Sequence, residues 1–178
     1  MKILVLVHNN FNDIELTTTI SCLQKTEKIT KITYFNPKYK EAKGQYNIVE
    51  LKLENDFNIN EYDAIFIPGG KGAKELRNDK NSLTIINQFV KQNKFVLAIC
   101  DAPNVLFENS IIKNENYSSF PIYNLKCGLN RNNNMVSVDS KFITAKCAAS
   151  AMEFGLEIVK IFFGENDYNK VKSAMFGN

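Results

Sequence analysis

Cys100 is the residue whose type and position could most readily do chemistry. It lies in the stretch VLAICDAP, residues 96–103, where four apolar residues precede the thiol. Such a run predicts a buried strand, while Asp101 near an N-cap and Pro103 in a first turn predict a helix start. A strand–Cys–helix elbow would hold the sulfur at the positive end of a helix dipole and lower the pKa of the thiol. We expect a reactive thiolate there; an inert buried cysteine is the alternative that this stretch leaves open.

Two further features belong to the same expected edge of the sheet. Glu15 starts the helix after the first strand, and Gly69-Gly70 ends a central strand. A carboxyl group there could share a proton with the thiol or act as a general acid or base. The N–H groups of a Gly-Gly turn could form an oxyanion pocket. The alternatives are a Glu15 charge that only favours its first helical turn and a glycine pair that only makes a tight turn.

Several classes of site are not expected. Cys22, Cys127 and Cys147 show no CxxC spacing, and a chain with one histidine, His8, is a poor candidate for a Cys/His zinc site. The first strand is not followed by GxGxxG, and PGGKGAKEL lacks the GK[ST] ending of a phosphate loop. We therefore predict no metal and no cofactor. His8, at the end of the first strand, is interpreted as a loop histidine, with a catalytic role at the same edge of the sheet as the alternative.

The charge and hydropathy of the chain limit the classes of partner that we expect it to bind. The net charge is +3, and no basic block is interleaved with aromatic residues, so nucleic acid is not an expected partner. The apolar start, Ile3 to Val7, is too short for a signal sequence, and no run approaches a membrane span. We expect a soluble cytoplasmic protein with free thiols.

Apolar strands alternate with amphipathic helices along the chain. This order predicts one α/β domain over residues 1–178, with a mostly parallel sheet covered by helices on both faces. The expected strands are 2–7, 31–35, 48–53, 63–67 and 95–99, with a strand pair at 135–138 and 142–145. The expected helices are 14–25, 73–92 and 148–163, with a short terminal helix at 168–176.

Four stretches resemble one known family. MKILVLV…NDIE, YDAIFIPGGKGAKEL, VLAICDAPNVL and FITAKCAASAMEFGLEIV are similar to the ThiJ/PfpI superfamily, in the branch of the parkinsonism-associated protein deglycase. The resemblance extends from Met1 to about Gly164 and implies a flavodoxin-like three-layer sandwich that forms a homodimer. It implies an oxidation-prone nucleophile at Cys100, a hydrogen-bonding acid at Glu15, and an oxyanion pocket from the backbone of Gly69, Gly70 and Asp101.

The resemblance leaves two function classes open. In the first, the chain is a glyoxalase- or deglycase-like enzyme for small oxoaldehydes or their protein adducts. In the second, it is a non-catalytic oxidative-stress sensor or chaperone-like protein whose Cys100 becomes a sulfinate. The expected small-molecule partner is accordingly a carbonyl compound or an oxidant.

At three positions near the expected pocket, the chain departs from the pattern of the family it resembles. Phe120 stands where related chains carry a pocket histidine, and Asp101 stands where protease-like relatives carry one. Protease activity is therefore not expected. Glutamine amidotransferases need a His-x-Glu pair after the cysteine, and no histidine follows His8, so this activity is not expected either. Cys147 replaces a glycine that the resemblance places at the pocket rim, either as a resolving thiol or as a pocket wall.

Overall fold

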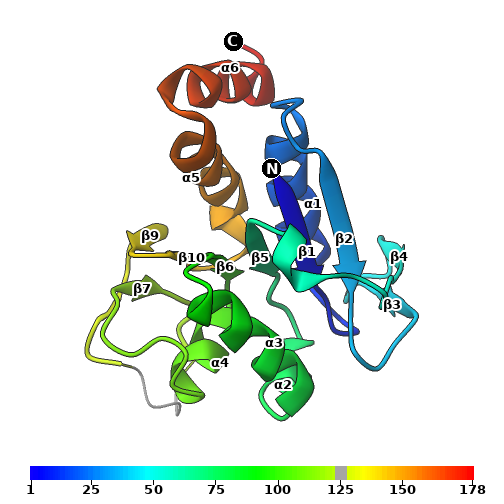
Figure 1. The fold of residues 1–178 in the computed structure, drawn as a ribbon. Coiled ribbons are helices and arrows are strands. Elements are labelled where there is room, and N and C mark those ends of the chain that lie inside the picture. Colours follow the sequence, from blue (N-terminus) through cyan, green and yellow to red (C-terminus); the bar gives the residue numbers. More distant parts are fainter. Residues whose placement is uncertain (123–127) are drawn as a thin grey trace.

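A six-stranded sheet organises the computed structural model, which describes residues 1–122 and 128–178 (Figure 1). Its strand order is β2-β1-β5-β6-β10-β9, and every neighbouring pair is parallel except β10 with β9 at one edge. The strands are β1 (Lys2–Leu6), β2 (Lys31–Phe35), β5 (Ala64–Ile67), β6 (Phe95–Ile99), β9 (Val136–Asp139) and β10 (Phe142–Ala145). The chain has the α/β class and flavodoxin-like arrangement that the sequence predicts.

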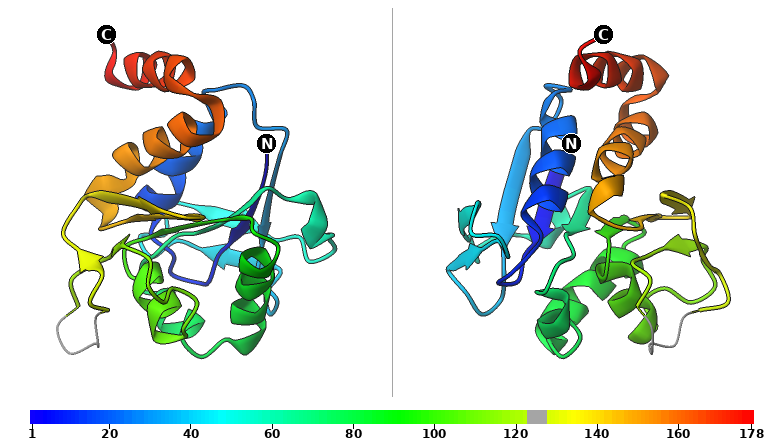
Figure 2. Two further views of the ribbon diagram at one scale, coloured as in Figure 1. Left: turned by 60° about the vertical axis from the view of Figure 1, so that its left-hand side comes forward. Right: turned by 180° about the vertical axis from the view of Figure 1, so that it is seen from behind.

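Helices cover both faces of this sheet (Figure 2). One face carries α1 (Asp13–Gln24) and α5 (Ala151–Phe163), with α6 (Glu165–Phe176) across the end of α5. The other face carries α2 (Ala73–Leu76), α3 (Lys80–Lys91) and α4 (Ala102–Glu108). Two short pairs lie outside the main sheet, β3 (Glu41–Lys43) with β4 (Glu50–Lys52) and β7 (Tyr117–Ser118) with β8 (Arg131–Asn132). Single 3-10 turns occupy Ile59–Glu61 and Ala148–Ser150.

The central strands β5 and β6 are apolar at every position, and β1 is apolar after Lys2, because both faces of these strands are buried. In β1, Ile3 and Val5 face the core under α1 and α5, whereas Leu4 and Leu6 face the core under α3 and α4. Successive strand side chains point to opposite faces, so one apolar run supplies both cores. This explains why the central strands read as continuous apolar stretches in the sequence.

Two predicted elements differ from the structure. The helix expected over 73–92 is two helices, because Asp79 caps α3 through its side chain, which accepts the N–H of Ser82. The strand expected over 48–53 is only Glu50–Lys52, and it pairs with β3 rather than with the main sheet. In the second case, the N–H groups of Ile48 and Val49 donate to Asp13 instead of to a strand.

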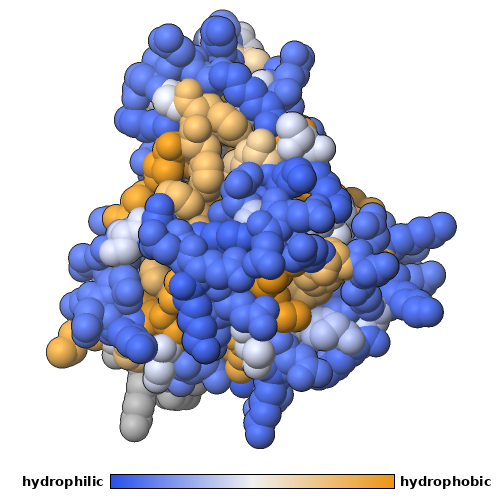
Figure 3. Space-filling view, in the orientation of Figure 1, coloured by the Kyte–Doolittle hydropathy of each residue, from blue (hydrophilic) through white to orange (hydrophobic). Residues whose placement is uncertain are grey.

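The face of the molecule shown in Figure 3 is mostly hydrophilic, with an apolar strip over α5 beneath α6. Lys28, in the turn after α1, reaches Asp167 of α6 at 2.5 Å and ties the last helix to the first. Among the residues that the structure describes, no helix is long and apolar enough to cross a membrane.

Candidate active site

Cys100 lies in a sharp turn between β6 and α4. Its φ is +64°, a left-handed conformation that costs a non-glycine residue about 1–2 kcal/mol. Both of its backbone polar groups are engaged: its N–H donates to the carbonyl of Ala145 at 2.9 Å, and its carbonyl accepts the N–H of Phe120 at 2.8 Å. The elbow predicted from the sequence is therefore present, and neighbouring segments hold it in place.

Glu15 is fully buried in the first turn of α1, beside this elbow. Its Oε2 accepts the N–H of Gly69 at 2.8 Å, while its Oε1 makes no ordinary hydrogen bond with any described residue. Burial raises the pKa of Glu15 to about 7, and its contacts with the Cys100 thiol and the Gly69 N–H oppose that rise. A carboxyl group with this pKa can both accept and return a proton near neutral pH.

The Gly-Gly turn after β5 lies directly against the thiol. A side chain at Gly69 would place its Cβ 2.6 Å from the Cβ of Cys100 and 2.9 Å from Oε2 of Glu15, so only glycine fits. Gly70 has a φ of +91°, which also favours glycine. The N–H groups of Gly70 and Asp101 hydrogen-bond to the Cys100 sulfur and lower the pKa of its thiol.

The thiol nevertheless differs from the expectation of a lowered pKa. Burial is the largest influence, and together with the nearby Glu15 carboxyl group it raises the pKa of Cys100 above its ordinary value. Two backbone N–H groups do not compensate for the loss of water. The resting group is therefore a thiol, and it needs a proton acceptor such as Glu15 to become a nucleophile.

The side chain of Asp101 binds Arg77, the residue that directly follows α2. The guanidinium donates to both carboxylate oxygens, at 2.6 and 2.8 Å, and its Nε donates to Glu108 at 2.8 Å. Asn104 adds a 3.0 Å hydrogen bond to the same carboxylate. The expected N-cap role is not fulfilled, because Asp101 makes no capping hydrogen bond with its side chain. Its carboxylate is instead ion-paired with Arg77, which Glu108 shares.

An open pocket of about 480 Å³ lies in front of Cys100. It brings together most of the residues that the sequence singled out, with Phe120 and Cys147 on its wall. Cys147 is a free thiol whose sulfur lies 3.7 Å from Oγ of Ser150 within its own turn. Cys127 lies outside the described residues. The lining residues are Asn12, Glu15, Gln45, Tyr46, Gly70, Lys71, Cys100, Asp101, Phe120, Ile122, Cys147, Ala148 and Ala149.

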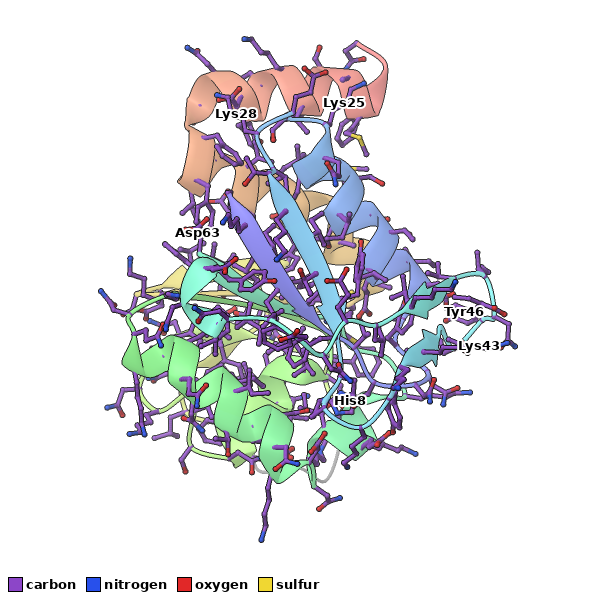
Figure 4. The ribbon with its side chains drawn as sticks, turned by 45° about the vertical axis from the view of Figure 1, so that its right-hand side comes forward. His8, Lys25, Lys28, Lys43, Tyr46 and Asp63 are labelled. Atoms are coloured by element: carbon purple, nitrogen blue, oxygen red, sulfur yellow. The ribbon has the colours of Figure 1, made fainter. Side chains whose placement is uncertain are left out.

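The loop between β3 and β4 forms one wall of the pocket, and the carboxylate of Asp13 holds this loop in place. Asp13 is buried and accepts the N–H groups of Tyr46, Ile48 and Val49 at 2.9–3.1 Å. These hydrogen bonds keep the pKa of Asp13 below its usual value despite burial. Tyr46 projects from the β3–β4 hairpin at the same end of the molecule as His8 (Figure 4). The residue that starts α1 thus positions the loop that faces the thiol.

His8 does not join the pocket. It is buried at the end of β1, where its Nε2 lies 3.1 Å from Oδ2 of Asp79 and 3.5 Å from Oγ of Ser82. Burial lowers its pKa against the opposing effect of Asp79, so the ring is neutral near pH 7. His8 lies in the loop after β1, as expected, and is a buried partner of the α3 cap.

The described residues form no cluster of the side chains that usually bind metal ions. Within residues 1–122 and 128–178, no three His, Cys, Asp or Glu side chains lie close enough together to hold an ion.

The sequence did not indicate several of the residues that line or support the pocket. Asn12, Gln45, Tyr46 and Lys71 line the pocket, and Arg77 fixes the elbow from outside it. The polar Asn12-Asp13 pair before Glu15 is a recognisable helix start. No local pattern marks Arg77, whose partner is 24 residues away in the chain.

The chain is similar to proteins of one family over most of its length. The profile of the DJ-1/PfpI family matches residues 1–161. Protein MG029 of Mycoplasma genitalium is 40% identical over 99% of this chain and 97% of its own. Deglycase PH1704 of Pyrococcus horikoshii is 25% identical over 90% of this chain and 99% of its own. Protein/nucleic acid deglycase 2 of Escherichia coli is 32% identical over 63% of this chain and 66% of its own.

Solved structures show the same fold. The oxidized DJ-1 of Toxoplasma gondii superposes with a TM-score of 0.85, at 23% identity, over 98% of this chain and 97% of its own.

Proposed function

Because the chain belongs to the DJ-1/PfpI family, we propose that it has a deglycase-like role, acting on small 2-oxoaldehydes or their protein adducts through Cys100 and Glu15. Relatives named as deglycases support this reaction class. The observation that carries the proposal is the Cys100 thiol beside a buried carboxyl group and two backbone N–H donors, all at an open pocket.

The residues supply each group that the reaction of methylglyoxal to lactate requires. Glu15 accepts the thiol proton while the Cys100 sulfur adds to the aldehyde carbon. The aldehyde oxygen takes the negative charge, and the N–H groups of Gly70 and Asp101 stabilise it. Glu15 next gives the thiol proton to the ketone oxygen, which becomes the alcohol oxygen of the product. The regenerated carboxylate then takes the proton from the aldehyde carbon and delivers it to the neighbouring carbon, and the C=O bond of the first carbon re-forms. This step oxidises the first carbon to a thioester and reduces the second to an alcohol. Water hydrolyses the thioester to lactate and restores the thiol.

Lactate formation by the purified protein tests this function. We expect production from methylglyoxal by the wild type, and none above the buffer background for Cys100→Ser, which keeps the side-chain size. Lactate at equal rates from both proteins, or from neither, would overturn the proposal.

A redox-sensing role is the second candidate, and one observation favours it. Glu15 Oε1 is buried without an ordinary hydrogen-bond partner among the described residues, and a protonated carboxyl group there would donate to an oxygen on the sulfur. Cys100 oxidised to a sulfinate would meet the same N–H groups. Mass spectrometry after mild peroxide treatment should show a gain of two oxygens at Cys100 before any other cysteine. Oxidation of all cysteines at one rate would reject this role.

We also propose that the protein is a homodimer. Ile14, Tyr46 and Ile48 are 48%, 55% and 75% exposed, and the backbone of Tyr46 and Ile48 is bound to Asp13 beside Ile14. This apolar patch adjoins the pocket, and a second copy would cover it. Light scattering should show a dimer at micromolar concentration that Ile48→Glu dissociates and Val138→Glu, on β9, does not. A wild-type monomer would contradict the proposal.

A further inference from the structure

The pocket in front of Cys100 has an uneven charge balance. Asp101 is ion-paired with Arg77, and Glu15 is largely protonated below its raised pKa of about 7. Lys71 is the basic residue on the pocket wall, exposed to solvent. Among the described side chains, none forms an ion pair with its ammonium group. A ligand in this pocket therefore meets one cation and no free anion when Glu15 is protonated.

The neutral polar side chains on the same wall also present donors. Oδ1 of Asn12 accepts the N–H groups of Ile14 and Glu15, at 3.0 and 3.3 Å. Oε1 of Gln45 accepts the N–H of Lys71 at 3.2 Å. A backbone N–H can only donate, so both amides must turn their oxygens toward the protein. Their NH₂ groups are what remains for a ligand.

We propose that this pocket selects carbonyl substrates that also carry a carboxylate, and that Lys71 binds the carboxylate with help from the amide groups of Gln45 and Asn12. A carboxylate accepts hydrogen bonds and donates none, which matches a wall of donors. At about 480 Å³ the pocket also has more room than a three-carbon aldehyde fills. The identity of the reacting carbonyl group rests on the proposed function; the carboxylate site does not.

A pair of alkylating reagents tests the carboxylate site without any turnover. Iodoacetate and iodoacetamide both form a sulfur–carbon bond with the Cys100 thiolate and release iodide, and they differ only in a carboxylate or an amide. The ratio of their rates at Cys100, followed by mass spectrometry of its peptide, cancels the fraction of thiolate. We expect Lys71→Gln to lower this ratio about fivefold, as the loss of one partly solvated charge pair would.

Lys74→Gln is the matched control, since Lys74 is exposed on the same turn but does not line the pocket. It should leave the ratio unchanged. High salt should lower the wild-type ratio, since ions screen exposed charges. An equal ratio in wild type and Lys71→Gln, or an equal change in Lys74→Gln, would overturn the proposal.

A substrate pair separates this proposal from the proposed function. 4,5-Dioxopentanoate and its methyl ester present the same 2-oxoaldehyde with and without a carboxylate. We expect Lys71→Gln to lower the ratio of kcat/KM between acid and ester about fivefold, mainly through KM. If neither compound reacts but the alkylation ratio still depends on Lys71, the proposed function fails and the carboxylate site stands. If both compounds react and the ratio of their kcat/KM values is the same in the wild type and in Lys71→Gln, the function stands and the carboxylate site is refuted.

Discussion

Two buried polar clusters lie at the carboxyl ends of β6 and β1, which β5 separates, and they differ in their access to solvent and in the direction of their hydrogen bonds. Cys100 and Glu15 face an open pocket. His8, Asp79 and Ser82 have the residue types of a hydrolytic triad, but all three are at most 4% exposed. The Ser82 hydroxyl donates to Asp79 at 2.7 Å, whereas a nucleophilic serine must donate to the imidazole.

This difference shows that residue types alone do not identify a site. The His8 cluster satisfies its own hydrogen bonds and supports the start of α3. The Cys100 cluster leaves one oxygen of Glu15 without an ordinary hydrogen bond to a described residue and keeps a strained φ at the thiol. Unsatisfied and strained groups beside a pocket indicate chemistry, whereas satisfied groups away from solvent indicate stability.

The largest expected effect separates the two clusters by activity. Cys100→Ser should reduce lactate formation from methylglyoxal to background, because the hydroxyl is a far weaker nucleophile at this site. Ser82→Ala should keep activity within about twofold and lower stability by about 1 kcal/mol, since it removes one hydrogen bond. Steady-state kinetics and urea unfolding of both variants check this. An inactive but folded Ser82→Ala protein would reverse the assignment.

Glu15→Gln should have the next largest effect, a loss of about 10²–10⁴-fold in kcat/KM, as expected when a general acid–base group is removed. The wild-type profile of kcat/KM against pH should rise through about pH 7, where Glu15 ionises. The pH profile of Glu15→Gln should lack this rise. Its Cys100 pKa should fall, because the carboxyl group contributes to raising it. Titration of thiolate absorbance measures this shift, and identical pKa values in both proteins would contradict the coupling.

The two clusters should also change stability with pH in opposite directions. The pKa of Glu15 is about 7 in the fold against an ordinary 4.5, so the folded state holds an extra proton and loses stability as pH rises between these values. At about 1.4 kcal/mol per pKa unit, the loss reaches about 3 kcal/mol. The lowered pKa of His8 means that the unfolded state binds the extra proton, so stability falls as pH drops below about 6.5.

Urea unfolding between pH 4.5 and 7.5 checks these signs. Relative to wild type, Glu15→Gln should gain stability as pH rises, and His8→Gln should gain stability as pH falls. Parallel curves for the three proteins would show that neither group changes its pKa on folding.

The smallest expected effect concerns Cys147. Its sulfur lies against Ser150 in its own turn, so we expect it to act as a pocket wall. Cys147→Ala should change the rate of Cys100 oxidation less than twofold. After mild peroxide treatment, peptide mass spectrometry should find a sulfinate at Cys100 and a free Cys147. A linked Cys100–Cys147 peptide would instead assign the resolving role.

The sequence by itself determined the parts of this protein that local pattern encodes. The apolar runs of β1, β5 and β6 predict buried parallel strands, because every position must be apolar when both faces are covered. The carboxyl ends of parallel strands meet at one edge of a sheet, so the strand pattern alone assigns Gly69 and Cys100 to the same edge.

The tertiary structure alone decided which of these groups touch and with what charge. Arg77 pairs with Asp101, and burial beside Glu15 raises the pKa of the thiol where a helix start predicted the opposite. His8 turns away to Asp79 across 71 residues of sequence. Such contacts join residues that are far apart in the chain, and no sequence pattern indicates that they meet. Hydrogen-bond partners, desolvation and access to the pocket therefore follow only from how the elements pack.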